Sequence, residues 1–237
     1  LVSVDGGSLR NAIPREAFAT ITIMPEAYDD VISMIGEYED MFIREYDGIE
    51  DNISFSAEEV DCPKTCLPEE VQDFLIHALT TCPHGVYRVI PEMPDIVETS
   101  NNLAMISTEA DKVLVYCLTR SSVESRKEEL QSIIQSCFAI AGADVEFSGS
   151  YPGWKPNLKS ELLAKMKEVY VHEFQIEPRI VIIHAGLECG LFLEKYPYLD
   201  MVSIGPQMVG VHSPQERLSI SSTARCWQWL QRTLEML

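Results

Sequence analysis

The side chain of this sequence best suited to bind a metal is a histidine in a polar loop. His212 stands in the run Gly210-Val211-His212-Ser213-Pro214-Gln215-Glu216. A neutral imidazole is a good ligand for Zn²⁺, and Glu216 or a carbonyl group could accept a hydrogen bond from its second nitrogen. The alternative is a surface-loop histidine with an ordinary hydrogen bond. The loop follows an expected strand over 200–204, and open α/β sheets bind ligands at the carboxyl ends of strands.

A second loop of this kind follows another expected strand, over 179–184. It reads His184-Ala185-Gly186-Leu187-Glu188-Cys189-Gly190. Glu188 could contact a metal or a substrate, or it could cap a helix, where an acidic side chain is favourable. His184 ends an apolar run, which favours a buried, hydrogen-bonded histidine over a metal ligand.

Two further polar side chains could bind a substrate. Arg120 follows the apolar strand Val113–Leu118, and its guanidinium could form two parallel hydrogen bonds with a carboxylate. A surface ion pair with Glu124 is the alternative. Asn11 precedes the extended element Ile13-Pro14, and its amide could donate to a developing oxyanion. The alternative for Asn11 is an asparagine in a turn.

The segments that must position these side chains change character at residues 148–158. Before this stretch, hydrophobic periodicity predicts strands over 17–24, 53–60, 102–108, 112–120 and 143–149, and helices over 25–44, 67–82 and 122–141. The order from 95 to 150 is strand, strand, helix, strand. This is most of a ferredoxin-like sandwich, in which helices cover one face of an antiparallel sheet.

The stretch 148–158 is rich in Gly and Pro and is typical of a linker. After it, the sequence predicts helices over 159–174 and 221–236 and strands over 179–184 and 200–204. The continuous apolar run Arg179–His184 is typical of a strand that is buried on both faces of an α/β sheet. Two strands make a poor core, so this part is expected to be the tail of a larger α/β domain.

Charge and hydropathy exclude several classes of function. The 237 residues include 18 basic and 37 acidic side chains, a formal net charge of −19. Such a surface repels phosphate backbones and anionic membranes, so we expect neither nucleic acid nor a membrane as a partner. No stretch approaches the roughly 18 apolar residues of a membrane span, and the first residues lack the features of a signal peptide.

Cysteine usage predicts a reducing compartment. The chain has seven cysteines, an odd number, and most of them stand in apolar runs. Buried free thiols explain this pattern best and indicate the cytoplasm. Cys62 and Cys66 could form half of a zinc site, but no second pair follows at a suitable spacing.

Seven runs of residues occur in one order from residue 5 to near the C-terminus. They are Asp5–Ala17, Val97–Asn102, Cys117–Ser121, Tyr151–Trp154, His184–Phe192, Asp200–Pro206 and Val211–Glu216. In that order the sequence closely resembles the aminoacyl-histidine dipeptidases, also called Xaa-His dipeptidases or peptidase D, of the M20 metallopeptidase family. The run His184–Gly190 is the most specific of the seven.

The resemblance implies a fold in two parts. Residues 1–150 would be most of a ferredoxin-like lid that can mediate dimerisation, and residues 151–237 would be the C-terminal part of an α/β zinc-peptidase catalytic domain. A homodimer is therefore expected, in which Asn11 could serve the partner's site. The implied activity is hydrolysis of dipeptides, notably Xaa-His, by water activated between two zinc ions about 3.5–4 Å apart.

The resemblance also implies roles for individual residues. His212 matches the last zinc ligand, and Gly186 matches a loop position whose backbone contacts the substrate. Arg120 matches a lid arginine that holds the substrate carboxylate, and Asn11 matches a lid asparagine near the scissile group. These three, Asn11, Arg120 and Gly186, are the expected substrate-binding residues.

The family's other zinc ligands and its general-base Glu have no counterpart in this chain. No His-x-Asp run occurs in it. A catalytic zinc needs about three protein ligands, and the resemblance supplies one. The chain is therefore expected to be a C-terminal fragment that contains no catalytic residue and is inactive by itself.

The sequence is also compatible with a second class of function. Residues 1–150 could form a non-catalytic ferredoxin-like binding or dimerisation module, with the tail after residue 157 as a docking element. Zinc content and dipeptidase activity would distinguish this module from an enzyme.

Overall fold

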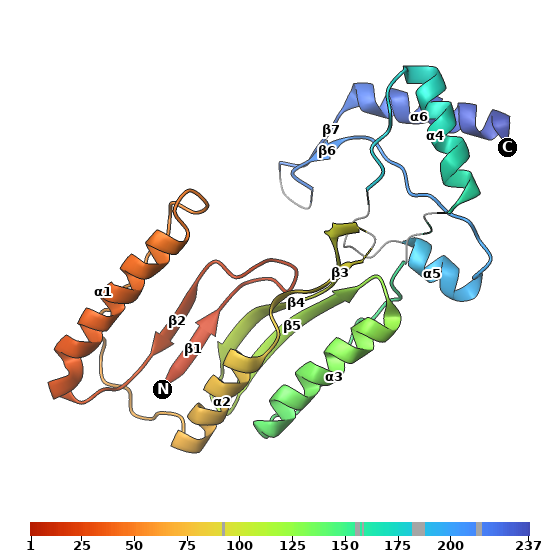
Figure 1. Ribbon diagram of the computed structural model, residues 1–237. Coiled ribbons are helices and arrows are strands. Elements are labelled where there is room, and N and C mark those ends of the chain that lie inside the picture. Colours follow the sequence, from red (N-terminus) through yellow and green to blue (C-terminus); the bar gives the residue numbers. More distant parts are fainter. Residues whose placement is uncertain (92, 155–156, 158, 182–187, 212–214) are drawn as a thin grey trace. The chain divides into compact units, whose positions relative to one another are not determined.

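The computed structural model describes residues 1–91, 93–154, 157, 159–181, 188–211 and 215–237 of the chain (Figure 1). The chain divides into two compact units. Unit 1 comprises Leu1–Cys82, Asn102–Leu118 and Ser136–Asp144, and unit 2 comprises Pro83–Asn101, Thr119–Gln135 and Val145–Leu237.

The helices that lie wholly in unit 1 form where periodicity and end signals predict them. A short 3-10 turn, η1 (Pro25–Ala27), leads into α1 (Tyr28–Glu45), and α2 spans Glu69–Thr81. The first turn of α1 carries Asp29 and Asp30, and its last turn carries Arg44. These charges complement the helix dipole. The predictions of helices over 25–44 and 67–82 are confirmed.

The strands of unit 1 are held by backbone pairing and by one threonine. β1 (Ser3–Gly6) pairs antiparallel with β2 (Ala17–Thr20), and Gly6 of β1 pairs with Ile106 of β4 (Met93–Thr108). Thr108 Oγ1 donates to the Val4 carbonyl at 2.8 Å and accepts from the Val4 amide at 2.8 Å. The same side chain thus satisfies both backbone groups of one β1 residue.

β4 is followed by β5 (Val113–Ser121), with which it pairs. The Glu109 amide donates to the Lys112 carbonyl at 2.8 Å in the tight turn between them. This hairpin confirms the predicted strands over 102–108 and 112–120. Helix α3 (Glu124–Ile140) comes next and confirms the helix predicted over 122–141.

The buried centre of unit 1 is small and contains a thiol pair. Ala78, Ala104 and Phe138 are buried, and so is Cys82 at the end of α2. Cys82 Sγ lies 4.0 Å from Cys117 Sγ. Hydrogen bonding to the Cys117 thiol and burial both raise the pKa of Cys82, so this thiol stays neutral and packs as an apolar group.

Unit 2 contains a strand that was not predicted from the sequence. β3 (Gly85–Ile90) pairs antiparallel with β4, from Gly85 opposite Asn101 to Ile90 opposite Met93. Ile90 is buried, as are Leu130 and Ile134 of α3. These three side chains are buried apolar residues of unit 2.

The rest of unit 2 is organised around two helices that contact each other, α4 (Glu161–Phe174) and α6 (Ile220–Met236). The Trp229 indole N–H donates to the Met166 carbonyl at 2.8 Å, and its ring meets the edge of Tyr170 with centroids 4.9 Å apart. Both helices confirm the predictions over 159–174 and 221–236. The remaining elements are α5 (Glu188–Lys195) and the short hairpin β6 (Met208–Val209) and β7 (Arg217–Leu218).

Three predicted strands are wrong. Residues 53–60, 143–149 and 200–204 are described and form no strand. The prediction over 179–184 lies partly outside the described residues, and 179–181 form no strand. Alternating apolar residues favour burial, but a strand also needs a partner for its backbone hydrogen bonds, and these segments pair with none of the described strands. The fold is a mixture of helices and antiparallel strand pairs without the last strand of the predicted ferredoxin-like order.

The start of α4 is capped by two side chains from different segments. Ser160 Oγ accepts from the Leu163 amide at 2.9 Å, and Asp200 Oδ2 accepts from the Leu162 amide at 3.1 Å. Hydrogen bonds from the Ser160 hydroxyl and from the Leu162 amide lower the pKa of Asp200. Asp200 thus attaches the segment after α5 to the positive end of α4.

This cap predicts a pH dependence of stability. Because the pKa of Asp200 is lowered in the folded chain, its contribution is complete above the ordinary carboxyl pKa and is lost as the pH falls through the lowered value. Asp200→Asn should therefore lower the urea midpoint more at about pH 7 than at about pH 3.

Ser219 provides the control for this experiment. Its hydroxyl oxygen caps α6 by accepting from the Ser222 amide at 3.4 Å, and it does not titrate. Ser219→Ala should lower the midpoint to a similar extent at both pH values. An equal loss at both pH values for Asp200→Asn would show that the charge of Asp200 adds nothing to the cap.

Candidate functional site

The predicted substrate residue Asn11 lies in unit 1, in the loop between β1 and β2. The Ala12 amide donates to the Leu9 carbonyl at 3.2 Å, which places Arg10 and Asn11 at the corner of a four-residue turn. Asn11 is exposed. Asn11 is therefore a turn asparagine, one of the two interpretations made from the sequence. The other interpretation, a donor to an oxyanion, is also compatible with this position, because an exposed amide can contact a ligand.

The base of this loop requires a glycine. Gly7 has a φ of +71°, and a Cβ at this position would lie 1.9 Å from the Ala104 carbonyl oxygen. Only glycine permits both this conformation and this close approach to β4. The Gly7 amide donates to the Glu16 carbonyl at 3.2 Å and closes the loop. The Asp5-Gly6-Gly7 run therefore positions the turn that carries Asn11.

A residue that was not among the candidates predicted from the sequence holds the turn itself. Asn102 Nδ2 donates to the Arg10 carbonyl at 3.0 Å and to the Ala12 carbonyl at 2.7 Å. These two carbonyls flank Asn11. The contact joins residues about ninety positions apart, so no local pattern could have revealed it.

The second predicted substrate residue, Arg120, lies in unit 2, near the end of β5, and is half-buried. Its neighbours Thr119 and Ser121 share the opposite face of the strand, because successive side chains alternate. Thr119 Oγ1 donates to Asn101 Oδ1 at 3.0 Å, and Ser121 Oγ lies 2.9 Å from Thr99 Oγ1. The hydrogen bonds of these two neighbours thus hold the part of the strand that carries Arg120.

The alternative partner that the sequence offered to Arg120 is engaged elsewhere in unit 2. Glu124 Oε1 lies 2.7 Å from Lys127 Nζ, and this ammonium group is buried. Lys127 Nζ also donates to the Tyr151 carbonyl at 2.9 Å and to Ser150 Oγ at 3.0 Å. Lys127 thereby attaches the stretch predicted as a linker to α3.

The polar run Val97–Asn102 in β4 is more buried than its composition suggests. Glu98, Thr99 and Asn101 are each less than a tenth exposed, and Glu98 Oε1 lies 2.9 Å from Arg88 Nε. Asn101 Nδ2 donates to the Pro83 carbonyl at 2.7 Å. Buried polar groups need partners, so five successive polar residues inside one strand were the signal for a network here.

The two remaining predicted site residues, Gly186 and His212, lie outside the described residues, as does His184. Glu188, which follows the first of these loops, is the exposed first residue of α5, where its charge faces the positive end of the helix. Among the described residues, no group of three or more His, Cys, Asp or Glu side chains could hold a metal ion.

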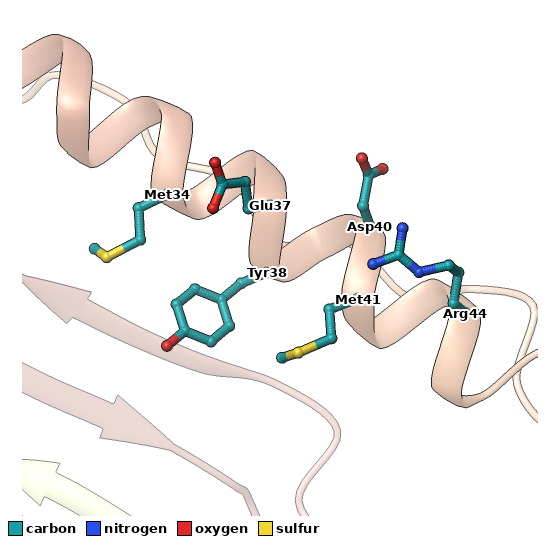
Figure 2. A pocket seen from close by; sticks show the side chains of 6 residues that line it. All are labelled: Met34, Glu37, Tyr38, Asp40, Met41 and Arg44. Atoms are coloured by element: carbon teal, nitrogen blue, oxygen red, sulfur yellow. The ribbon is translucent and has the colours of Figure 1, made fainter.

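The structure also contains an open groove of about 530 Å³ along α1. Figure 2 shows Met34, Tyr38 and Met41 on one side of this helix and the carboxylates of Glu37 and Asp40 on the other. None of the predicted site residues lines the groove.

In the described part of the chain, no helix combines the length and apolarity that crossing a membrane requires.

Comparisons with known proteins identify relatives along the whole chain. No protein-family model matches it. It is 39% identical over 235 residues to the cytosol non-specific dipeptidase of Escherichia coli (strain K12), a match that covers 99% of this chain and 48% of that protein. The crystal structure of aminoacylhistidine dipeptidase from Vibrio alginolyticus matches with a TM-score of 0.92 and 42% identity, over 100% of this chain and 48% of that one. The chain thus spans about half the length of these relatives.

Proposed function

Because this chain is a homologue of the aminoacylhistidine and cytosol non-specific dipeptidases, we propose that it is the substrate-holding part of an enzyme that hydrolyses dipeptides, Xaa-His among them. The observation that carries the proposal is the structural match with a TM-score of 0.92 over 100% of the chain. A second observation supports the proposal: the turn at Asn11 is held by hydrogen bonds and leaves Asn11 exposed, as a substrate contact would require.

Two side chains would bind the dipeptide in this proposal. Arg120 would form parallel hydrogen bonds with the C-terminal carboxylate, which selects dipeptides over long peptides. Asn11 would donate its amide to the oxygen of the scissile carbonyl as negative charge develops on it. The backbone at Gly186 would make a further contact with the substrate.

Zinc is proposed as the metal of the complete enzyme, with His212 as one of its ligands. The residues that the structure describes do not fit a dinuclear zinc centre, because they include no group of three or more ligating side chains. The other ligands and the general base would come from the remainder of the enzyme. We therefore propose that this chain alone is inactive.

The resemblance supports further proposals about the assembled enzyme. Residues 1–150 would act as a lid and residues 151–237 as part of the catalytic α/β domain. The enzyme would be a homodimer formed through the lid. A cytoplasmic location is supported by the name of the Escherichia coli relative, a cytosol dipeptidase.

The experiment compares this chain with a hybrid enzyme, defined as this chain joined to the part of the Escherichia coli relative that it does not match. We expect two zinc ions per hybrid subunit and hydrolysis of an Xaa-His dipeptide. The chain alone should bind fewer zinc ions and show no hydrolysis. Metal analysis by mass spectrometry and a dipeptide assay measure both properties.

Two results would contradict this proposal. Two tightly bound zinc ions with hydrolysis by the chain alone would show that it needs no further ligands. A folded hybrid enzyme that binds zinc but hydrolyses no dipeptide would favour a non-catalytic binding or dimerisation module instead.

A further inference from the structure

Asn102 uses both of its amide hydrogens on one turn of unit 1. Its Nδ2 donates to the carbonyls of Arg10 and Ala12, at 3.0 Å and 2.7 Å, and so brackets Asn11 on both sides. Two acceptors around one nitrogen determine which way the amide is turned, because an oxygen in that place would face two carbonyl oxygens. The orientation of the Asn102 side chain therefore follows from its contacts.

The carbonyl oxygen of the same amide limits how much Asn102 can stabilise the folded chain. Its Oδ1 is buried and has no hydrogen-bond partner among the described residues. An unpaired buried acceptor costs about 1–3 kcal/mol, which offsets the roughly 1 kcal/mol that each of the two donated bonds contributes. The net contribution of Asn102 to unfolding stability should therefore be small, although it restrains the turn strongly.

The surroundings leave the Asn11 side chain accessible while its backbone is held. Gly7 passes against the Ala104 carbonyl at the base of the loop, and the Leu9–Ala12 turn closes with its own hydrogen bond. Asn102 adds the third restraint, directly on the carbonyls beside Asn11, and Asn11 itself is exposed. A side chain on a fixed backbone loses less conformational entropy when it meets a ligand.

We propose that Asn102 is a positioning residue, which clamps the Leu9–Ala12 turn so that the Asn11 amide is held ready for the dipeptide carbonyl. This inference rests on the proposed function, since it assigns Asn102 a role in the proposed dipeptide-binding site. Asn102 touches no substrate in this scheme and acts only through Asn11.

The first test is hydrogen exchange in this chain with Asn102→Leu, which keeps a similar shape and removes both the donors and the unpaired acceptor. The amide of Ala12, which donates to the Leu9 carbonyl, should exchange about tenfold faster or more, which corresponds to the loss of at least one hydrogen bond. The urea midpoint should stay close to that of the unchanged chain. Unchanged exchange at Ala12 would overturn the proposal.

Thr108→Val is the matched control on the same strand. Thr108 also ties β4 to backbone groups of unit 1, at Val4, but it lies away from the turn. This variant should lower the urea midpoint and leave the local exchange of Ala12 unchanged. Equal acceleration at the turn in both variants would show a general loosening of the unit and contradict a specific clamp.

The second test measures coupling in the hybrid enzyme with Asn11→Ala, Asn102→Leu and the double variant. Asn102→Leu should lower kcat with little change in KM, and it should have little further effect once Asn11 is alanine. Fully additive effects would overturn the positioning role. If the unchanged hybrid hydrolyses no dipeptide, the proposed function fails, and so does the idea that Asn102 positions Asn11 for a substrate. The exchange experiment still decides whether the clamp exists.

Discussion

Replacing Arg120 by methionine in the hybrid enzyme is expected to lower kcat/KM for a dipeptide by about 10²–10³-fold, the equivalent of about 3–4 kcal/mol. Methionine keeps an unbranched stem of similar length but has no donor for a carboxylate. The loss should be specific to substrates with a free C-terminal carboxylate. Steady-state kinetics on a dipeptide and on its C-terminal amide would measure this, and the amide should be affected little.

Arg126 offers a matched control for this substitution. It also belongs to unit 2, but it pairs with Glu129 on the surface of α3 at 2.6 Å. Arg126→Met should leave kcat/KM for both substrates nearly unchanged, since an exposed pair of this type contributes little. If Arg120→Met lowered kcat/KM equally for the dipeptide and its amide, Arg120 would not be the carboxylate-binding residue.

Truncating Leu130 to alanine is expected to destabilise the chain by about 2–5 kcal/mol. Leu130 of α3 has no solvent-exposed surface and is among the largest fully buried side chains. Truncation would leave a cavity in unit 2 and would also reduce the buried apolar surface. Because a folded domain is stable by only about 5–15 kcal/mol, urea unfolding should show a large shift of the midpoint.

Ile140, on the same helix, provides the comparison. It is 80% exposed, so Ile140→Ala should change the unfolding free energy by no more than about 0.5 kcal/mol. Similar losses from Leu130→Ala and Ile140→Ala would mean that α3 is destabilised by substitution as such, not by a cavity.

Every helix except α5, which lies in a segment expected to be a loop, could be predicted from the sequence because the signals are local. Helices α1, α2, α4 and α6 carry apolar residues at helical spacing, and the first turns of α1, α2 and α4 are acidic. Each helix forms its hydrogen bonds within its own segment. The β4–β5 hairpin was predictable for a similar reason, since its strands are joined by a tight turn.

Strands that need distant partners were predicted less well. Residues 53–60, 143–149 and 200–204 have apolar patterns that favour burial, yet none of them forms a strand. β3 was also left unassigned, although its partner β4 follows it directly in the sequence. The register of a strand depends on the edge that receives it, and the sequence of a segment does not contain that information.

The sequence by itself determined which side chains are candidates for binding a carbonyl and a carboxylate, because Asn11 and Arg120 have the donors that these groups require. It also determined the relationship to the dipeptidases, which the comparisons confirm along the whole chain. Only the tertiary structure decided how Asn11 is held. The hydrogen bonds from Asn102 join segments about ninety residues apart, and only folding brings a donor to carbonyls at such a separation.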